Sequence, residues 1–380
     1  MPATLVLEDG FSLTGEKFSG RGETFGEVVF NTSLTGYQEM ITDPSYRGQI
    51  LVLTCPMIGN YGVNSCDSES IGPQIEGLLV KECSRRPSNR RAEQSLNAYL
   101  DQHEIIGVEG IDTRSLTLHL RSAGTMYGVI SNEDNDVSNL KRRVLAYKNQ
   151  NKRNLVDEVS TPGQYILHTP RVLMPEGDAP PGDPPEYHVV IYDFGVKYNI
   201  MRSLTARNCR ITVVPYHTTA DEIIKLQPDG VLLSNGPGDP IDQVSIVGQI
   251  QSLLGRVPIF GICLGHQLLA MALGYPTFKL KFGHRGGNHP VKDMRTGKVL
   301  ITSQNHGYCV QLKEFKCGTE ITHINLNDGT LEGIENRQLC CFSVQFHPEA
   351  APGPHDSNYL FDQFIAMMND SRAKGVGKNA

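Results

Sequence analysis

The second half of the chain alternates short apolar runs with amphipathic stretches, and this alternation restricts the fold more than any other feature. Runs rich in Val, Ile and Leu lie at 189–192, 211–214, 230–233 and 257–260. Amphipathic helical stretches separate them, at 198–206, 220–226 and 244–254. Short apolar strands that alternate with helices indicate a parallel sheet buried on both faces. We therefore expect a doubly wound, mostly parallel α/β sheet, with its chemistry in the loops at the carboxyl ends of the strands.

The first half of the chain has a different pattern, in which short β-like runs lie between Gly, Pro and Asn residues. These runs lie at 27–30, 49–53 and 77–80. Helices are expected at 92–102 and at 113–122, the second with Asp112 as its N-cap. The pattern predicts a mixed α/β domain with antiparallel content. The polar segment 131–152, basic toward its end, is interpreted as a solvated helix face rather than a binding site.

A Pro- and Gly-rich segment at 174–185 separates the two patterns. Five prolines and two glycines there oppose a regular element and favour an extended spacer. A chain of 380 residues also has room for about two domains. We predict an N-terminal domain at 1–173, a linker at 174–187 and a C-terminal domain at 188–380.

Charge and cysteine content exclude several classes of protein. The net charge is −6, so no bulk positive field attracts nucleic acid or an anionic membrane. The nine cysteines are scattered without a C-x-x-C pair, which argues against a disulfide framework or a zinc site and suits a reducing compartment. Residues 3–10 are typical of a strand and turn rather than a signal peptide, and no apolar run approaches 18 residues. We expect a soluble cytoplasmic protein.

The strongest local signal surrounds Cys263, where an apolar strand runs into G-I-C-L-G and an apolar helical stretch follows. This strand-turn-helix order is that of a nucleophile elbow, with Cys in place of Ser. The flanking glycines allow a sharp turn, and the dipole of the following helix favours the thiolate. A bare G-x-C-x-G fits a small buried side chain at a tight turn equally well.

A partner for such a thiol lies near the end of the chain, where the alternating run 342–346 is followed by His347, Pro348 and Glu349. At a period of two, residues 347 and 349 point to the same side of a strand, so the carboxylate can orient the imidazole. H-P-E alone is more typical of an exposed turn. Because both signals occur at strand ends of one α/β unit, we predict a Cys263–His347–Glu349 triad.

Two further loops suit acyl chemistry. S-N-G-P-G-D-P at 234–240 follows a predicted strand, and its glycines let backbone N–H groups approach an oxyanion, although an unoccupied turn is an equal alternative. S-Q-N-H-G-Y at 303–308 is a polar loop that could position a substrate. The chain has no G-K-[ST] phosphate loop and no H-x-x-x-H pair on a helix, so we predict neither nucleotide binding nor a metal site. The remaining histidines nearby are assigned to packing and hydrogen bonding: His266, His284, His289 and His306.

Together these motifs resemble the triad (class I) glutamine amidotransferases, through G-I-C-L-G-H-Q at 261–267 and H-P-E at 347–349. The N-terminal half narrows the resemblance to the small subunit of carbamoyl phosphate synthetase. In the N-terminal half, the segments that resemble this subunit are 34–46, 56–62 and 110–114. In the C-terminal half, 233–240 and 304–307 also resemble it. The match spans nearly the whole chain.

The resemblance implies roles for individual residues. Cys263 would be the nucleophile, His347 the base and Glu349 its orienting partner. Ser45 would reach the substrate from the N-terminal domain, which puts the pocket at a domain interface. Tyr308 departs from the Phe expected in the family. The implied contacts with L-glutamine are Ser45, Gly236, Gly238, Leu264, Gln267, Asn305, Gly307 and Tyr308.

The resemblance also implies a partner. Glutamine would be hydrolysed through a Cys thioester, and the ammonia passed to a large synthetase subunit that makes carbamoyl phosphate from ATP and bicarbonate. This chain would need no cofactor, because ATP and magnesium would bind only to that large subunit. Two alternatives stay open: a free-standing thiol hydrolase or peptidase of the same fold, and a non-catalytic scaffold with a vestigial triad.

Overall fold

The computed structural model describes residues 1–151, 153–167, 185–311 and 318–373. Two compact units divide the chain: Met1–Leu155 with Lys281–Gly286, and Val156–Leu280 with Gly287–Ala380. The division falls before the predicted linker, of which only residues 185–187 lie within the described part of the chain.

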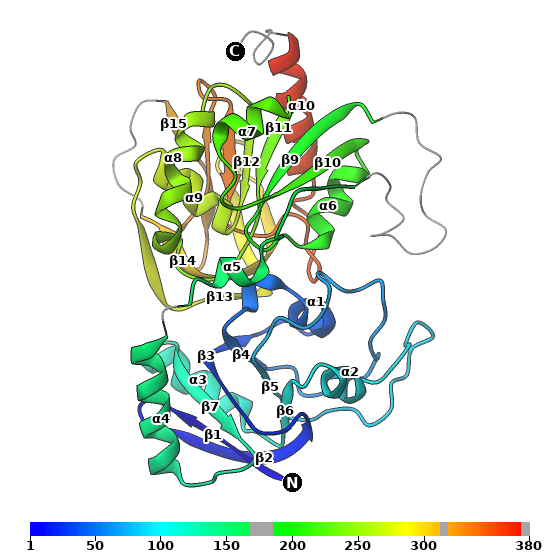
Figure 1. Ribbon diagram of the computed structural model, residues 1–380, viewed down its shortest axis with the longest axis vertical. Helices are drawn as coiled ribbons and strands as arrows, with labels where there is room; N and C mark the ends of the chain where they lie inside the picture. Colours follow the sequence, from blue (N-terminus) through cyan, green and yellow to red (C-terminus); the bar gives the residue numbers. More distant parts are fainter. Residues whose placement is uncertain (152, 168–184, 312–317, 374–380) are drawn as a thin grey trace. The chain divides into compact units, whose positions relative to one another are not determined.

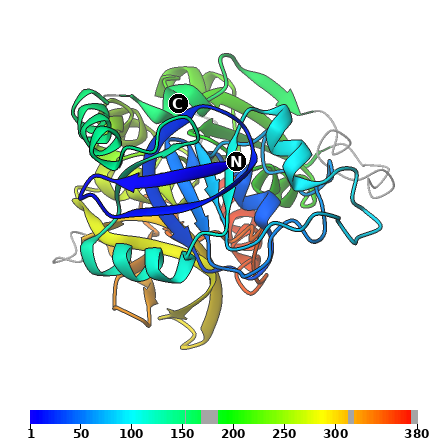
Figure 2. The same ribbon diagram turned by 90° about the horizontal axis from the view of Figure 1, so that it is seen from below.

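Seven strands form a closed barrel in the first unit, in the order β1-β2-β6-β5-β4-β3-β7. Parallel pairing joins β3, β4, β5 and β6, while the remaining neighbours are antiparallel. Figure 2 shows β1 and β2 running side by side in dark blue. The mixed α/β class with antiparallel content is confirmed. The strands are β1 (Pro2–Leu7), β2 (Ser12–Ser19), β3 (Glu23–Asn31), β4 (Gln49–Leu53), β5 (Gly77–Leu79), β6 (Ile106–Glu109) and β7 (Met126–Ser131).

Short helices bury apolar side chains against this barrel. Helix α3 begins where the Asp112 side chain accepts a hydrogen bond from Ser115 N, as predicted. Helix α2 starts later than predicted, because Gln94 is held in a bridge with Val63 before the helix can begin. Helix α4 buries only Leu140 and Val144, in agreement with a solvated face. The helices are α1 (Tyr37–Ile41), η1 (Pro44–Tyr46), α2 (Leu96–Gln102), α3 (Thr113–Ala123) and α4 (Val137–Gln150).

A ten-stranded sheet dominates the second unit, in the order β14-β13-β15-β16-β17-β12-β11-β9-β10-β8. Its centre, β10-β9-β11-β12-β17, is parallel, and antiparallel strands flank this centre. The strands are β8 (Tyr165–Leu167), β9 (Tyr187–Asp193), β10 (Cys209–Pro215), β11 (Gly230–Leu233), β12 (Ile259–Ile262), β13 (Thr277–Asp293), β14 (Val299–Val310), β15 (Thr319–Asn325), β16 (Leu331–Asn336) and β17 (Cys341–Val344).

Helices cover both faces of the parallel centre, as Figure 1 shows. Alternate residues of β9 explain this: Val189 and Ile191 pack with α6 and α10, whereas Val190 and Tyr192 pack with α7, α8 and α9. The doubly wound arrangement predicted from the apolar runs is therefore confirmed. The helices are α5 (Leu155–Val159), α6 (Tyr198–Thr205), α7 (Ala220–Lys225), η3 (Pro240–Gln243), α8 (Val244–Leu253), α9 (Leu264–Ala272) and α10 (Tyr359–Ala373).

Helix length and hydropathy bear on membrane association. Among the described residues, no helix combines the length and the apolar character needed to cross a bilayer.

Candidate functional site

Cys263 lies between the end of β12 and the start of α9, with φ 53° and ψ −104°. A non-glycine residue with this backbone conformation carries strain of about 1–3 kcal/mol, and it persists only because surrounding contacts hold the main chain in place. A Cβ on Gly265 would lie 2.1 Å from Leu233 O, and one on Gly261 would lie 2.7 Å from Gly265 O. Both flanking glycines are therefore required sterically, and the turn has the form of the predicted nucleophile elbow.

His347 and Glu349 lie just beyond the end of β17. The His347 ring approaches the carboxylate, with Nδ1 2.7 Å from Glu349 Oε1, and both side chains are buried. The prediction that strand alternation puts the two side chains on one side was wrong, because β17 ends at Val344. A turn brings the pair together instead: His347 N donates to Ser303 O, and Ala350 N donates to His347 O.

The thiol of Cys263 and the imidazole of His347 interact electrostatically. Burial by itself lowers the pKa of His347, but Glu349 and Cys263 together raise it above its ordinary value. His347 Nε2 is buried and makes no hydrogen bond of ordinary geometry among the described residues, while the Cys263 side chain is near enough to interact with the ring. The Cys263 thiol donates to Asn305 O at 3.7 Å. The three predicted side chains therefore share one buried site, in which one imidazole nitrogen is held by the carboxylate and the ring interacts with the thiol.

Lys197 is a component of this site that the sequence analysis missed. Its Nζ lies 2.9 Å from Glu349 Oε1 and 2.8 Å from Ala350 O, and the lysine side chain is only 3% exposed. Burial raises the pKa of Glu349, but Lys197 and His347 outweigh that effect and lower it. The carboxylate is thus held ionised against the imidazole. The available signal was a lysine five residues after the apolar run 189–192, in the loop at the carboxyl end of a predicted parallel strand.

The loop that carries Lys197 is shaped by side chains from two neighbouring strand ends. Asp193 Oδ1 accepts hydrogen bonds from the N–H groups of Gly195 and Val196, both at 2.9 Å. Lys197 N donates to Asn235 Oδ1 at 3.1 Å. The loop after β11 therefore fixes the direction in which the lysine leaves the sheet.

The turn after Glu349 is strained at two consecutive residues. Ala350 and Ala351 have φ values of 56° and 52°, in the left-handed region that favours glycine. Each costs about 1–3 kcal/mol and persists only where surrounding contacts determine the conformation. The Lys197 bond to Ala350 O is one such contact.

Several of the predicted glutamine contacts surround the elbow. A Cβ on Gly236 would lie 2.2 Å from Phe194 O and 2.9 Å from the Leu264 side chain, so this loop packs closely on the first turn of α9. Gln267 Nε2 donates to Tyr308 O at 2.9 Å, which joins α9 to β14. Gly307 lies on the same strand as Asn305 and Tyr308.

The other two predicted contacts are placed less directly. Gly238, with φ 90°, lies in the loop after β11. Ser45 lies in η1 of the first unit, where its N–H donates to Asp43 Oδ1. A glutamine pocket at a domain interface stays a prediction.

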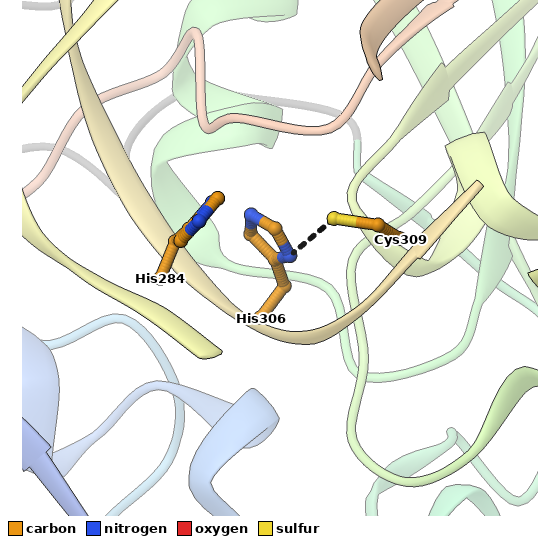
Figure 3. Close-up of side chains that lie close together, drawn as sticks. All are labelled: His284, His306 and Cys309. Atoms are coloured by element: carbon orange, nitrogen blue, oxygen red, sulfur yellow. Dashed lines mark hydrogen bonds between the residues drawn. The ribbon is translucent and has the colours of Figure 1, made fainter. Parts of the chain in front are cut away.

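Among the histidines near these loops, His306 takes part in hydrogen bonds. Figure 3 draws His284, His306 and Cys309; the Cys309 Sγ atom lies 3.8 Å from His306 Nδ1. His306 also approaches Tyr308 O through Nδ1 and Gln304 Oε1 through Nε2, each at 2.8 Å. Burial raises the pKa of Cys309, so it stays a thiol, and His284 belongs to the segment grouped with the first unit. The expectation of no metal stays a prediction.

His266, in the first turn of α9, is fully buried. Its Nδ1 lies 2.8 Å from Ser343 Oγ, and burial lowers its pKa to about 3. A neutral imidazole between α9 and β17 fits the packing role expected for it.

Comparisons with known proteins match both units. The family described as carbamoyl-phosphate synthase small chain, CPSase domain, matches residues 5–130, and glutamine amidotransferase class-I matches residues 190–367. The carbamoyl phosphate synthase small chain of Syntrophotalea carbinolica is 50% identical, over 98% of this chain and 99% of that protein. The pyrimidine-specific small chain of Bacillus subtilis is 48% identical, over 99% and 98%.

A solved glutamine amidotransferase structure from Thermotoga maritima is 17% identical over 50% of this chain and 86% of that chain, with a TM-score of 0.35. This chain is about half identical to these two small chains over almost its full length, matches both family models, and has a Cys–His–Glu site in its second unit. It is therefore a member of the carbamoyl phosphate synthase small chain family.

Proposed function

We propose that the second unit hydrolyses L-glutamine to glutamate and ammonia through a thioester on Cys263. The observation that carries this proposal is the strained elbow that presents Cys263 beside an imidazole whose Nδ1 is held by a buried carboxylate. This arrangement has the parts of nucleophilic acyl transfer: a nucleophile, a base and a group that orients the base. Its imidazole nitrogen Nε2 is left for proton transfer.

The chemistry proceeds in two steps. The Cys263 thiolate attacks the side-chain amide carbon of glutamine, and a tetrahedral oxyanion forms. His347 gives its proton to the departing nitrogen, which leaves as ammonia, and a γ-glutamyl thioester remains. Water, deprotonated by His347, then attacks the thioester and releases glutamate. Glu349 keeps the imidazole oriented and stabilises its cationic form.

Backbone N–H groups would stabilise the oxyanion. The N–H of Leu264 belongs to the first turn of α9, where helical N–H groups lack intrahelical partners. The Gly236 loop packs against the same turn, which supports it as the second donor. Ser45 is proposed as a further contact from the first unit. The remaining proposed substrate contacts are Gly238, Gln267, Asn305, Gly307 and Tyr308.

The ammonia has a destination outside this chain. Family membership implies a large synthase subunit as partner. We assign to that subunit the use of ATP, magnesium and bicarbonate to make carbamoyl phosphate. The glutaminase chain itself would then need no cofactor.

One experiment tests both halves of this proposal. The Cys263→Ala chain, purified in complex with its large subunit, is assayed for carbamoyl phosphate synthesis with glutamine or with ammonium. Glutamine-dependent synthesis should disappear, because the nucleophile is gone. Ammonium-dependent synthesis should stay near the unsubstituted rate, because free ammonia bypasses the thioester. Unchanged glutamine-dependent synthesis would exclude Cys263 as the nucleophile. Loss of both activities in an intact complex would contradict the assignment of ammonia release to this chain and of carbamoyl phosphate synthesis to the large subunit.

A further inference from the structure

Asn199 connects helix α6 to the turn that carries Glu349. Its Nδ2 donates to Glu349 O at 2.9 Å, across 150 positions of the chain. The acceptor is the main-chain carbonyl, so the contact acts on the position of the residue and not on its carboxylate. Asn199 is half-buried, in the first turn of α6 and two residues after Lys197.

The neighbours of Asn199 determine which way its amide points. A carbonyl oxygen only accepts hydrogen bonds, so it requires the NH₂ group of Asn199. On the other side of the amide, Arg202 Nη1 approaches Asn199 Oδ1 at 3.4 Å, and a guanidinium only donates. Both contacts favour the same orientation of the amide.

The turn that Asn199 holds depends on contacts from outside. Ala350 and Ala351 both adopt left-handed conformations that their side chains disfavour. Lys197 binds Ala350 O and the Glu349 carboxylate, and Asn199 binds Glu349 O. Removing Asn199 leaves the main chain of Glu349 without this anchor, while its carboxylate must still stay 2.7 Å from His347 Nδ1.

We infer that Asn199 is a positioning residue for glutamine hydrolysis, which fixes the backbone of Glu349 so that its carboxylate holds the His347 imidazole in the reactive orientation. This inference rests on the proposed function of the same site. Asn199 is neutral, so its removal changes geometry without removing a charge, which distinguishes it from Lys197.

Two substitutions and one matched control test the inference. Asn199→Ala removes the amide, and Asn199→Leu keeps nearly its size without a hydrogen-bond donor and without adding a charge. Arg202→Ala is the control, because it removes the opposite contact of the same amide and leaves the bond to Glu349 O intact. All three are assayed in complex with the large subunit, by glutamine hydrolysis and by ammonium-dependent synthesis, and their thermal unfolding is recorded.

We expect both Asn199 variants to lose about tenfold in kcat with KM changed less than about twofold, because a misplaced base affects the transition state more than substrate binding. Arg202→Ala should retain kcat within about twofold. The groups that raise the pKa of His347 against burial are Glu349 and Cys263. A looser Glu349 contact lowers that pKa, so the alkaline limb of the kcat/KM profile should move to lower pH.

Several results would overturn the inference. These are unchanged kcat in both Asn199 variants, a rise in KM alone, an unmoved alkaline limb, or an equal loss of kcat in Arg202→Ala. If Asn199→Ala unfolds, Asn199→Leu carries the test, since its size is nearly conserved and it adds no charge. Failure of the proposed function is distinguishable, because the unsubstituted complex would then show no glutamine hydrolysis at all.

Discussion

Substitution of Lys197 by Met should destabilise the chain strongly, because it leaves a buried carboxylate with only one of its two charged partners. Met has nearly the length of Lys but lacks the ammonium that bonds to Glu349 Oε1 at 2.9 Å and to Ala350 O at 2.8 Å. Breaking a buried ion pair on one side costs about 3–5 kcal/mol. We expect the lower end of this range, because His347 still pairs with Glu349.

The loss can be measured by urea unfolding of the full chain. At a slope of about 2–3 kcal/mol per molar urea, a loss of about 3 kcal/mol lowers the midpoint by about 1–1.5 M. Lys225→Met is the matched control, because Lys225 is an exposed lysine on α7 of the same unit. The urea midpoint of Lys225→Met should correspond to a free energy of unfolding within about 0.5 kcal/mol of that of the unsubstituted chain, as is usual for surface positions.

The destabilisation should also depend on pH in a defined direction. Burial raises the pKa of Glu349, but Lys197 and His347 lower it below the ordinary value of 4.5. Such a carboxylate contributes stability above pH 4.5, which is lost as the pH falls through the pKa of the folded state. The difference in urea midpoint between the unsubstituted chain and Lys197→Met should therefore become smaller below pH 4.5. A Lys197→Met midpoint equal to that of Lys225→Met at pH 7 would refute the reasoning.

Three further predictions concern the elbow and the triad. A glutamine-like electrophile should label Cys263 far faster than the buried thiols whose pKa burial raises, and peptide mapping after brief exposure checks this; uniform labelling would contradict it. Gly265→Ala should cost at least about 1–3 kcal/mol in the free energy of unfolding, since its Cβ would lie 2.1 Å from Leu233 O, and an unchanged urea midpoint would argue against this close approach. His347→Asn should lose several orders of magnitude in kcat for glutamine hydrolysis, because it removes the acid and base. Glu349→Gln should lose less, because it removes only the orientation of the imidazole. A larger loss in Glu349→Gln would count against the assigned roles. The buried thiols for comparison are Cys83, Cys209, Cys309 and Cys341.

The fold was largely predictable because hydrophobic periodicity is a local property of the sequence. The apolar runs at 49–53 and 230–233 coincide with β4 and β11, and the helices predicted from 198, 220 and 244 begin at those residues. Helix α2 was placed less well, because the bridge between Val63 and Gln94 is a tertiary contact that local propensity does not contain.

The candidate site was predictable only in part, for a related reason. Cys263 lies in a short motif with the recognisable order strand, turn, helix. His347 lies in a short motif with the order strand, turn. Lys197 and Asn199 have no such motif, and they reach the 349–350 turn across about 150 positions. Which lysine or asparagine completes a buried network is decided by strand order, and strand order is not written in any local pattern.

Strand β8 has a practical consequence for isolating the amidotransferase unit. It pairs with β10 through Tyr165, Ile166 and Leu167, and Thr161 N donates to Asp193 Oδ2 at 2.7 Å. A fragment cut at the start of β9 would leave β10 as a bare sheet edge and would take one donor from the buried Asp193, inviting aggregation. Excision at Val156 keeps both features, so protease trimming or recombinant dissection of this protein should preserve the stretch ahead of the proline-rich segment.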